Sequence, residues 1–242
     1  MASQPIAQSG ASGSLSCKPA PEDRLIPQTL NFIHAQLPAW RDDPKRPVGD
    51  SEKPLNSTLC DFLDIRSREY FPMVSFKHEE PLAKGRTVDI GIHGIEEVTL
   101  VVTFGYDIYD PILVIEAKRL PSPRKDRERE YVSGIAKATG GIQRFKLGLH
   151  GADVETAAIV GYIEEQSTHH WHATINTWIG DLSSKKSADG CVWTDADVLG
   201  ELICDEEQAT SATESNHQRT GTCRTSAIHL HHFWVIMSPG KS

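Results

Sequence analysis

Three charged side chains stand where two apolar segments of the chain end. Residues 112–115 are a short run of branched apolar residues typical of a buried strand, and Glu116 and Lys118 follow it directly. Because side chains alternate along a strand, Glu116 and Lys118 are predicted to share one face, with Ala117 on the other. Asp89 ends a second apolar segment 27 residues earlier, a spacing that fits a strand and a turn in between. Two carboxylates and a lysine meeting at adjacent strands would bind a divalent metal ion beside a group able to move a proton.

The elements that must position these residues follow from the periodicity of apolar side chains. Helical spacing predicts helices over 25–40, 55–65 and 171–182, a helix over 133–147 that Gly140 and Gly141 interrupt, and a short helical piece near 198–203. Branched or alternating segments predict strands at 73–77, 86–92, 98–104, 112–117, 157–163 and 227–237. Residues 118–130 and the polar stretch 183–224 are predicted to be largely irregular.

The order of the predicted elements favours an α/β sandwich with a mixed sheet: helices come first, then a meander of strands, then alternating helices and strands. Residues 1–22 have no apolar pattern and are predicted to be a disordered leader. Residues 23–242 are predicted to form one domain, with a core at about 52–165 and a C-terminal helix and strand within 166–242.

The order of these residues resembles the PD-(D/E)XK nuclease superfamily. Asp89, followed by Glu116-x-Lys118, resembles its signature, and residues 55–63 and 141–145 resemble the helices that flank its core. Val88 stands where the family name has proline. The resemblance covers roughly residues 52–165 and implies a restriction-endonuclease-like α/β/α sandwich with a central mixed sheet, and hydrolysis of DNA phosphodiester bonds.

The resemblance also implies roles for individual residues. Asp89, Glu116 and the backbone carbonyl of Ala117 would hold Mg²⁺, with Mn²⁺ as an alternative. Lys118 would orient or deprotonate a water molecule, or hold the phosphate. Gln143 resembles a catalytic glutamine found after the core in a subset of these nucleases.

Further polar residues near the signature have two interpretations each. Arg144 could contact a DNA phosphate, although a Gln-Arg pair on a helix surface explains Gln143 and Arg144 equally well. Glu79 and Glu80 could add a metal oxygen or lie in a solvated turn. Glu52 and Asn56 fall where the family's opening helix often places an acidic or amide group near the metal, but Glu52 precedes the apolar stripe by one turn.

The charge distribution bears on DNA binding. The chain of 242 residues has a formal net charge of −8, which argues against a nucleic-acid binder. However, residues 118–129 carry six basic and two acidic side chains, and Arg119, Arg124 and Lys125 within them are predicted to contact DNA. The other interpretation of this segment is a solvated loop of mixed charge.

Cysteines and apolar runs suggest the compartment. The five cysteines form no CxxC pair and no regular spacing, which indicates reduced thiols in a cytoplasmic protein. The sequence has neither an apolar run long enough to cross a membrane nor a secretory signal.

Two histidine clusters, at 169–172 and 229–232, raise a zinc alternative. His229 and His231 would share a strand face, but cysteine spacing supplies no ligand set, so we favour structural histidines.

The sequence therefore predicts a Mg²⁺-dependent DNA endonuclease, with a role in bacterial genome defence. It contains no evident sequence-reading module, so specificity would come from a homodimer, a partner subunit or DNA shape. The alternatives are a non-catalytic nuclease-like module that binds a protein partner, an enzyme acting on RNA or a small phosphodiester, and a histidine-based zinc protein.

Overall fold

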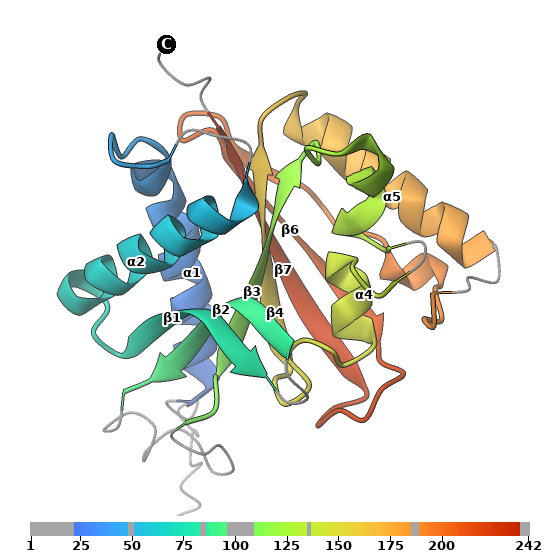
Figure 1. Ribbon diagram of the computed structural model, residues 1–242, viewed down its shortest axis with the longest axis horizontal. Helices are drawn as coiled ribbons and strands as arrows, with labels where there is room; N and C mark the ends of the chain where they lie inside the picture. The colour runs from blue at the N-terminus through green and yellow to red at the C-terminus, as the bar shows by residue number, and fades with distance from the viewer. Residues whose placement is uncertain are drawn as a thin grey trace, which may run out of the picture.

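The computed structural model describes residues 22–47, 51–82, 86–95, 109–134, 137–184 and 189–237. These residues form three layers, in which one mixed sheet separates two sets of helices (Figure 1). The sheet has seven strands in the order β1-β2-β3-β4-β7-β6-β5. Their bounds are β1 (Val74–Leu82), β2 (Arg86–Gly94), β3 (Leu113–Leu120), β4 (Thr156–Ile163), β5 (Ile203–Asp205), β6 (Thr210–Gln218) and β7 (Ala227–Ile236).

The helices divide between the two faces of the sheet. Two long helices, α1 (Glu22–Arg41) and α2 (Glu52–Tyr70), cover one face, and the short α4 (Gly141–Lys146) and α5 (Thr168–Ser184) lie on the other (Figure 1). Two 3₁₀ turns, η2 (Lys125–Tyr131) and η3 (Asp195–Asp197), join the second layer. The structure is therefore an α/β sandwich with a mixed sheet, as the sequence predicts.

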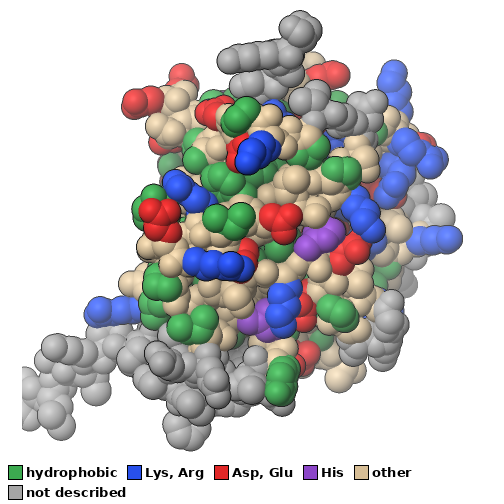
Figure 2. Space-filling view, turned by 60° about the vertical axis from the view of Figure 1, so that its left-hand side comes forward, with side chains coloured by type: hydrophobic (Ala, Val, Ile, Leu, Met, Phe, Trp, Pro, Cys, Tyr) green, Lys and Arg blue, Asp and Glu red, His purple; other side chains and the backbone are tan. Residues whose placement is uncertain are grey.

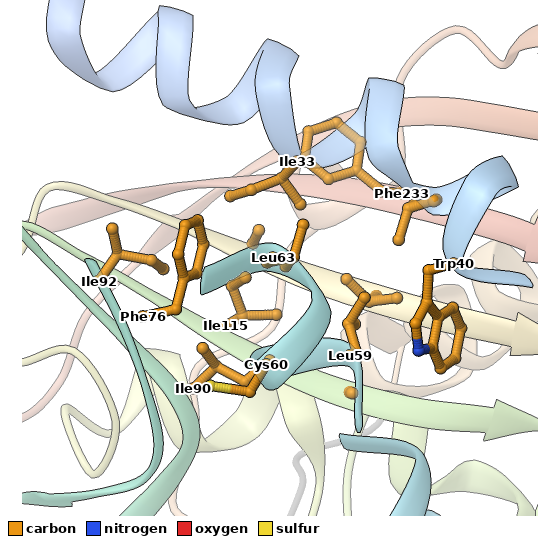
Figure 3. Close-up of a cluster of buried hydrophobic side chains, with 14 of the residues drawn as sticks. Ile33, Trp40, Leu59, Cys60, Leu63, Phe76, Ile90, Ile92, Ile115 and Phe233 are labelled. Carbon is orange, nitrogen blue, oxygen red and sulfur yellow. The ribbon is translucent and has the colours of Figure 1, made fainter. Parts of the chain in front are cut away.

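The first core lies between the sheet and the helices α1 and α2. Ile33, Leu59 and Leu63 from the helices are completely buried against Ile90 and Ile115 of the sheet (Figure 3). Each such side chain contributes about 1.5–3 kcal/mol when it leaves water, so this layer fixes where α2 begins relative to β2 and β3.

Three parallel strands form the centre of the sheet. β3 pairs with β4, and β4 pairs with β7, both in parallel, while the strands on either side are antiparallel. β4 is buried on both faces along almost its whole length, which explains its continuous run of apolar residues. The strand β3 that carries Glu116 and Lys118 is thus held between β2 and β4.

A buried chain of polar groups runs under the second helical layer. Lys146 contacts Asp197, whose Oδ1 also lies 2.7 Å from His217 Nδ1. Ser215 Oγ lies 2.7 Å from His217 Nε2 and 2.8 Å from Nε2 of His232. His232 continues the chain through Nδ1, which lies 2.8 Å from the hydroxyl of Tyr131. Every member is buried, so each polar group depends on its neighbour in place of water.

Several predicted elements are correct and others are not. The helices at 25–40, 55–65 and 171–182 and the strands at 73–77, 86–92, 112–117, 157–163 and 227–237 are present, most of them longer than predicted. The prediction of an irregular 183–224 is wrong, because β5 and β6 lie within it, and the helical piece at 198–203 is absent. The helix predicted over 133–147 is reduced to α4.

Some expectations fall on other parts of the chain. The predicted strand 98–104 and the predicted disordered leader lie outside the described residues, apart from the start of α1 at Glu22. Among the helices described, none is long and apolar enough to cross a membrane. On the face in Figure 2, which brings forward the left-hand side of Figure 1, basic and acidic side chains are intermixed and histidines reach the surface.

We predict that Asp197→Ala destabilises the fold by about 3–5 kcal/mol, because it leaves the buried ammonium of Lys146 without its counter-charge. Urea unfolding followed by circular dichroism measures this loss. Asp195→Ala, two positions away and exposed, is the control and is expected to cost less than about 1 kcal/mol. Equal effects of the two substitutions would show that the buried ion pair is not what holds this layer.

Candidate active site

Glu116 is the most deeply buried carboxylate of the region, with a side chain 1% exposed. Its Oε1 lies 2.8 Å from Lys118 Nζ and 2.8 Å from Arg144 Nη1, and its Oε2 lies 3.0 Å from His150 Nδ1. Burial by itself would raise the pKa of Glu116, but Lys118, His150 and Arg144 together outweigh it and hold that pKa well below its usual range. Glu116 is therefore a carboxylate at neutral pH.

Lys118 lies two residues further along β3 and on the same face, as the alternation predicts. Its side chain is 12% exposed, and its Nζ is 3.9 Å from Glu52 Oε2. Burial would lower the pKa of Lys118, but Glu116, Glu52 and Asp89 outweigh it and raise that pKa to about 12. Lys118 is thus an ammonium at neutral pH, which makes it a proton donor and a positive charge in place of a base.

Asp89 lies where β2 and β3 separate. The paired register of these strands ends with Ile90 opposite Ile115, and beyond it Asp89 Oδ2 accepts a 2.8 Å hydrogen bond from the backbone N–H of Ala117. A side-chain oxygen thereby replaces the backbone carbonyl that a continued ladder would supply.

The environment of Asp89 differs from that of Glu116. Burial, followed by the nearby charge of Glu116, raises the pKa of Asp89 to about 7, although Lys118 and the Ala117 N–H act in the opposite direction. Two neighbouring carboxyls with widely separated pKa values are characteristic of catalytic sites.

Glu52 is the third acidic member of the cluster. It is the first residue of α2, and its Oε1 accepts a 3.1 Å hydrogen bond from the backbone N–H of Arg119. Packing of the apolar face of α2 on the sheet brings this helix start to the end of β3. The structure therefore brings together Asp89, Glu116, Lys118 and Glu52.

The donor set fits a hard divalent cation. A carboxylate offers about four lone-pair positions, and of these Glu116 uses one to accept the hydrogen bond from Arg144, while Lys118 and His150 lie within 3.0 Å as charged or chargeable neighbours. Within the described part of the chain, Asp89 Oδ1 accepts no hydrogen bond. The raised pKa of Asp89 means that negative charge is in excess there, and a Mg²⁺ ion with its oxygen preference would relieve it.

Gln143 does not have the catalytic position that the sequence predicts, because its side chain bonds to backbone groups. Its Oε1 accepts hydrogen bonds from the backbone N–H groups of Gly134, at 2.9 Å, and Gly140, at 3.1 Å. Its Nε2 donates to the carbonyl of Asp189 at 3.0 Å. The amide is buried, its hydrogen bonds hold the loop before α4, and it does not join the charged cluster.

The other candidate metal ligands are also directed elsewhere. Glu80 is buried, lies across Gly91 and approaches His93, with 3.2 Å between Oε2 and Nε2. Glu79 pairs with Lys53 on the surface at 2.9 Å. Asn56 accepts a 3.1 Å hydrogen bond from the hydroxyl of Tyr162.

The arginines predicted to contact DNA differ in accessibility. Arg119 is 7% exposed and forms two hydrogen bonds with Glu164, so burial removes its guanidinium from the surface where the sequence placed it. Arg144, predicted to contact a DNA phosphate, donates a hydrogen bond to Glu116. Arg124 is exposed and pairs with Asp126, and Lys125 is exposed at the start of η2.

A cavity of about 420 Å³ opens beside Lys118. Its lining includes Lys53, Arg124 and Arg127 among the basic residues and Glu52 and Glu130 among the acidic ones. The cavity is large enough for a nucleotide-sized group and gives the ammonium of Lys118 a route to solvent.

His150 is the member of the site that sequence reasoning missed. It lies between α4 and β4, is 4% exposed, and its Nδ1 lies 3.0 Å from Glu116 Oε2. The two residues are 34 positions apart in the chain, and no local sequence pattern links them. Only the fold brings it to the carboxylate, because it is a single histidine after a glycine-containing turn.

Comparison of the chain with protein-family models, with curated proteins and with solved structures finds no match. A functional assignment therefore depends on the geometry of the site and on the residues that form it.

We predict that Asp89→Asn stabilises the metal-free protein at pH 8 by up to about 4 kcal/mol and has a smaller effect at pH 5. The ordinary pKa of this carboxyl is 3.8, whereas in the folded chain it is about 7, so the folded state binds the proton more tightly. The resulting stability is complete below pH 3.8 and is lost as the pH rises to about 7, and asparagine preserves the neutral form throughout.

Urea unfolding in EDTA at the two pH values measures this difference. Asp61→Asn, an exposed carboxylate on α2, is the matched control and is expected to change stability by less than about 0.5 kcal/mol at either pH. A gain for Asp89→Asn that does not depend on pH would contradict the assignment.

Proposed function

We propose that the protein is a metal-dependent nuclease that hydrolyses DNA phosphodiester bonds. The single observation that carries the proposal is a buried cluster of two carboxyl groups and one ammonium. Lys118 pairs with Glu116 at 2.8 Å, and the charges of both residues act on the pKa of Asp89. This is the arrangement implied by the resemblance to PD-(D/E)XK nucleases, and it accompanies a mixed sheet between two helical layers. We propose that the fold is restriction-endonuclease-like.

Asp89, Glu116 and the carbonyl of Ala117 would hold Mg²⁺ or Mn²⁺. When bound, the ion would polarise the phosphodiester and lower the pKa of a coordinated water molecule. Side chains of the protein would hold the phosphate, orient the water molecule and position Glu116.

Lys118 has the charge to stabilise the phosphate as negative charge develops on it. Its ammonium lies beside the cavity, and its raised pKa keeps it protonated at neutral pH. Lys118 would therefore hold the scissile phosphate and orient the attacking water through donated hydrogen bonds.

Arg144 and His150 would act through Glu116 as positioning residues. Arg144 donates a 2.8 Å hydrogen bond to Oε1 of that carboxylate, and His150 Nδ1 lies 3.0 Å from its Oε2, so the two residues limit the orientations open to Glu116. Glu52 would in turn limit the movement of Lys118.

A specific observation favours the second candidate, a non-catalytic module that binds a protein partner. Arginines near the site are paired with acidic groups, as in Arg119–Glu164, Arg124–Asp126 and Arg127–Glu130, and the net charge is −8. Such pairing weakens the positive field that attracts DNA. On this reading a partner subunit or a second copy would supply the DNA contacts.

We predict that the purified chain cleaves supercoiled and linear DNA in Mg²⁺ and that EDTA abolishes the cleavage. Lys118→Ala is expected to lower the cleavage rate by about 10²–10⁴-fold, because the ammonium facing the phosphate is lost. Lys45→Ala, an exposed lysine in the turn after α1, is the control and is expected to cleave like the wild type.

Asp89→Asn separates loss of activity from loss of folding, since it is expected to be inactive and yet more stable at pH 8. Cleavage of RNA measured in the same buffer decides between the two nucleic acids. Wild-type rates in both Lys118→Ala and Asp89→Asn would rule out the proposed site. A folded wild type that cleaves neither substrate would favour the protein-binding module.

A further inference from the structure

We propose that Glu214, His229 and His231 form a second metal site, which binds Zn²⁺ or a transition-metal ion of similar preference. These side chains lie on β6 and β7, and none of them belongs to the cluster around Glu116. Their potential ligand atoms all lie within 4.8 Å of one another. The inference does not depend on the proposed nuclease activity.

The register of the sheet explains why the three side chains meet. Glu214 lies directly opposite His231 in the antiparallel β6–β7 pair, and His229 is two residues before His231 on β7. Because side chains alternate, the three project from the same face. The ladder therefore fixes their spacing without help from a flexible loop.

The distances within the cluster suit a bound ion. His229 Nε2 lies 3.0 Å from Glu214 Oε2, and His231 Nδ1 lies 3.1 Å from Glu214 Oε1. Zn²⁺ bonds of 2.0–2.1 Å in tetrahedral geometry separate donor atoms by about 3.3 Å. The two histidine–carboxylate distances are already close to this value, and all three ligand atoms lie within 4.8 Å of one another, so side-chain rotation would bring them around one ion.

The donor types select the class of metal. Two imidazole nitrogens and one carboxylate suit Zn²⁺ and its transition-metal neighbours, whereas Mg²⁺ and Ca²⁺ take oxygen ligands. The cluster and the oxygen-rich site at Asp89 and Glu116 therefore differ in the ion that each prefers.

The cluster faces a cavity of about 600 Å³ between α1 and the sheet. Three protein ligands leave one position of a tetrahedral ion open, and this cavity can supply a water molecule or a small anion. His34 of α1 lines the same cavity and stacks on Phe233, with ring centroids 4.9 Å apart. Its Nε2 is buried and has no hydrogen-bond partner among the described residues, but His34 does not belong to the group whose ligand atoms lie within 4.8 Å of one another.

The two sites are well separated. His229 pairs with Thr156 at the beginning of β4, whereas Lys118 pairs with Gly161 five residues further along the same strand. At 3.2–3.4 Å per residue, the sites lie about 16 Å apart along the strand direction alone. Loss of one site can therefore be measured without damage to the other.

The experiment uses the full chain, stripped with EDTA, dialysed, and titrated with ZnCl₂ and separately with CoCl₂. We expect one tightly bound Zn²⁺ per chain by metal analysis after desalting, visible d–d bands from Co²⁺, and a melting temperature that rises with Zn²⁺. Glu214→Gln and His229→Gln, whose side chains are 57% and 34% exposed, are expected to fold and to weaken binding by at least about 100-fold.

Two further variants locate the ion. His169→Gln, an exposed histidine on α5, is expected to bind Zn²⁺ like the wild type, and so is Asp89→Asn. Binding that survives both Glu214→Gln and His229→Gln, binding that is lost only in Asp89→Asn, or the absence of saturable Zn²⁺ binding by the folded wild type would each overturn the proposal.

Discussion

The site depends on keeping one carboxylate ionised where water cannot reach it. Glu116 is almost completely buried on a central strand, and an isolated charge there would cost several kcal/mol. Lys118, Arg144 and His150 offset that cost from three directions, and each comes from a different part of the chain. The positions of β3, α4 and the turn that follows α4 are therefore linked by a single electrostatic requirement.

The same arrangement leaves Asp89 with too little positive charge around it. Lys118 is shared among three acidic groups, of which Glu116 is the nearest, so Asp89 retains a pKa of about 7 while that of Glu116 is depressed. The fold thus tolerates one carboxyl whose ionised form is unfavourable in the absence of a cation. Such local instability is common where a protein reserves a position for a ligand, because the ligand supplies the missing interaction.

Residue patterns were informative where a strand or helix is regular. The alternation at Glu116 and Lys118 predicted their common face, and the apolar stripe at 55–65 predicted α2. Contacts that depend on the tertiary fold had no comparable signal, as with His150 at Glu116 or Gln143 in its backbone role. β6 gives no strand signal because its sequence is polar. Its buried serine, threonine and histidine side chains bond to one another and to the loops that cover them. Nothing in the sequence shows that Arg119 is buried, because a guanidinium paired with Glu164 in the interior has the same sequence signal as an exposed one.

The parallel pairing of β4 with β7 has a consequence for how the chain reaches its native state. Residues 156–163 are buried on both faces, yet one of their two partner strands comes from 229–236, near the C-terminal end of the described chain. Pairings between such distant segments carry a large loop-closure cost and form late. During synthesis, the side of β4 that pairs with β7 therefore stays an open apolar edge until β7 has left the ribosome. In that interval a nascent chain of this kind is most exposed to aggregation and most dependent on chaperones.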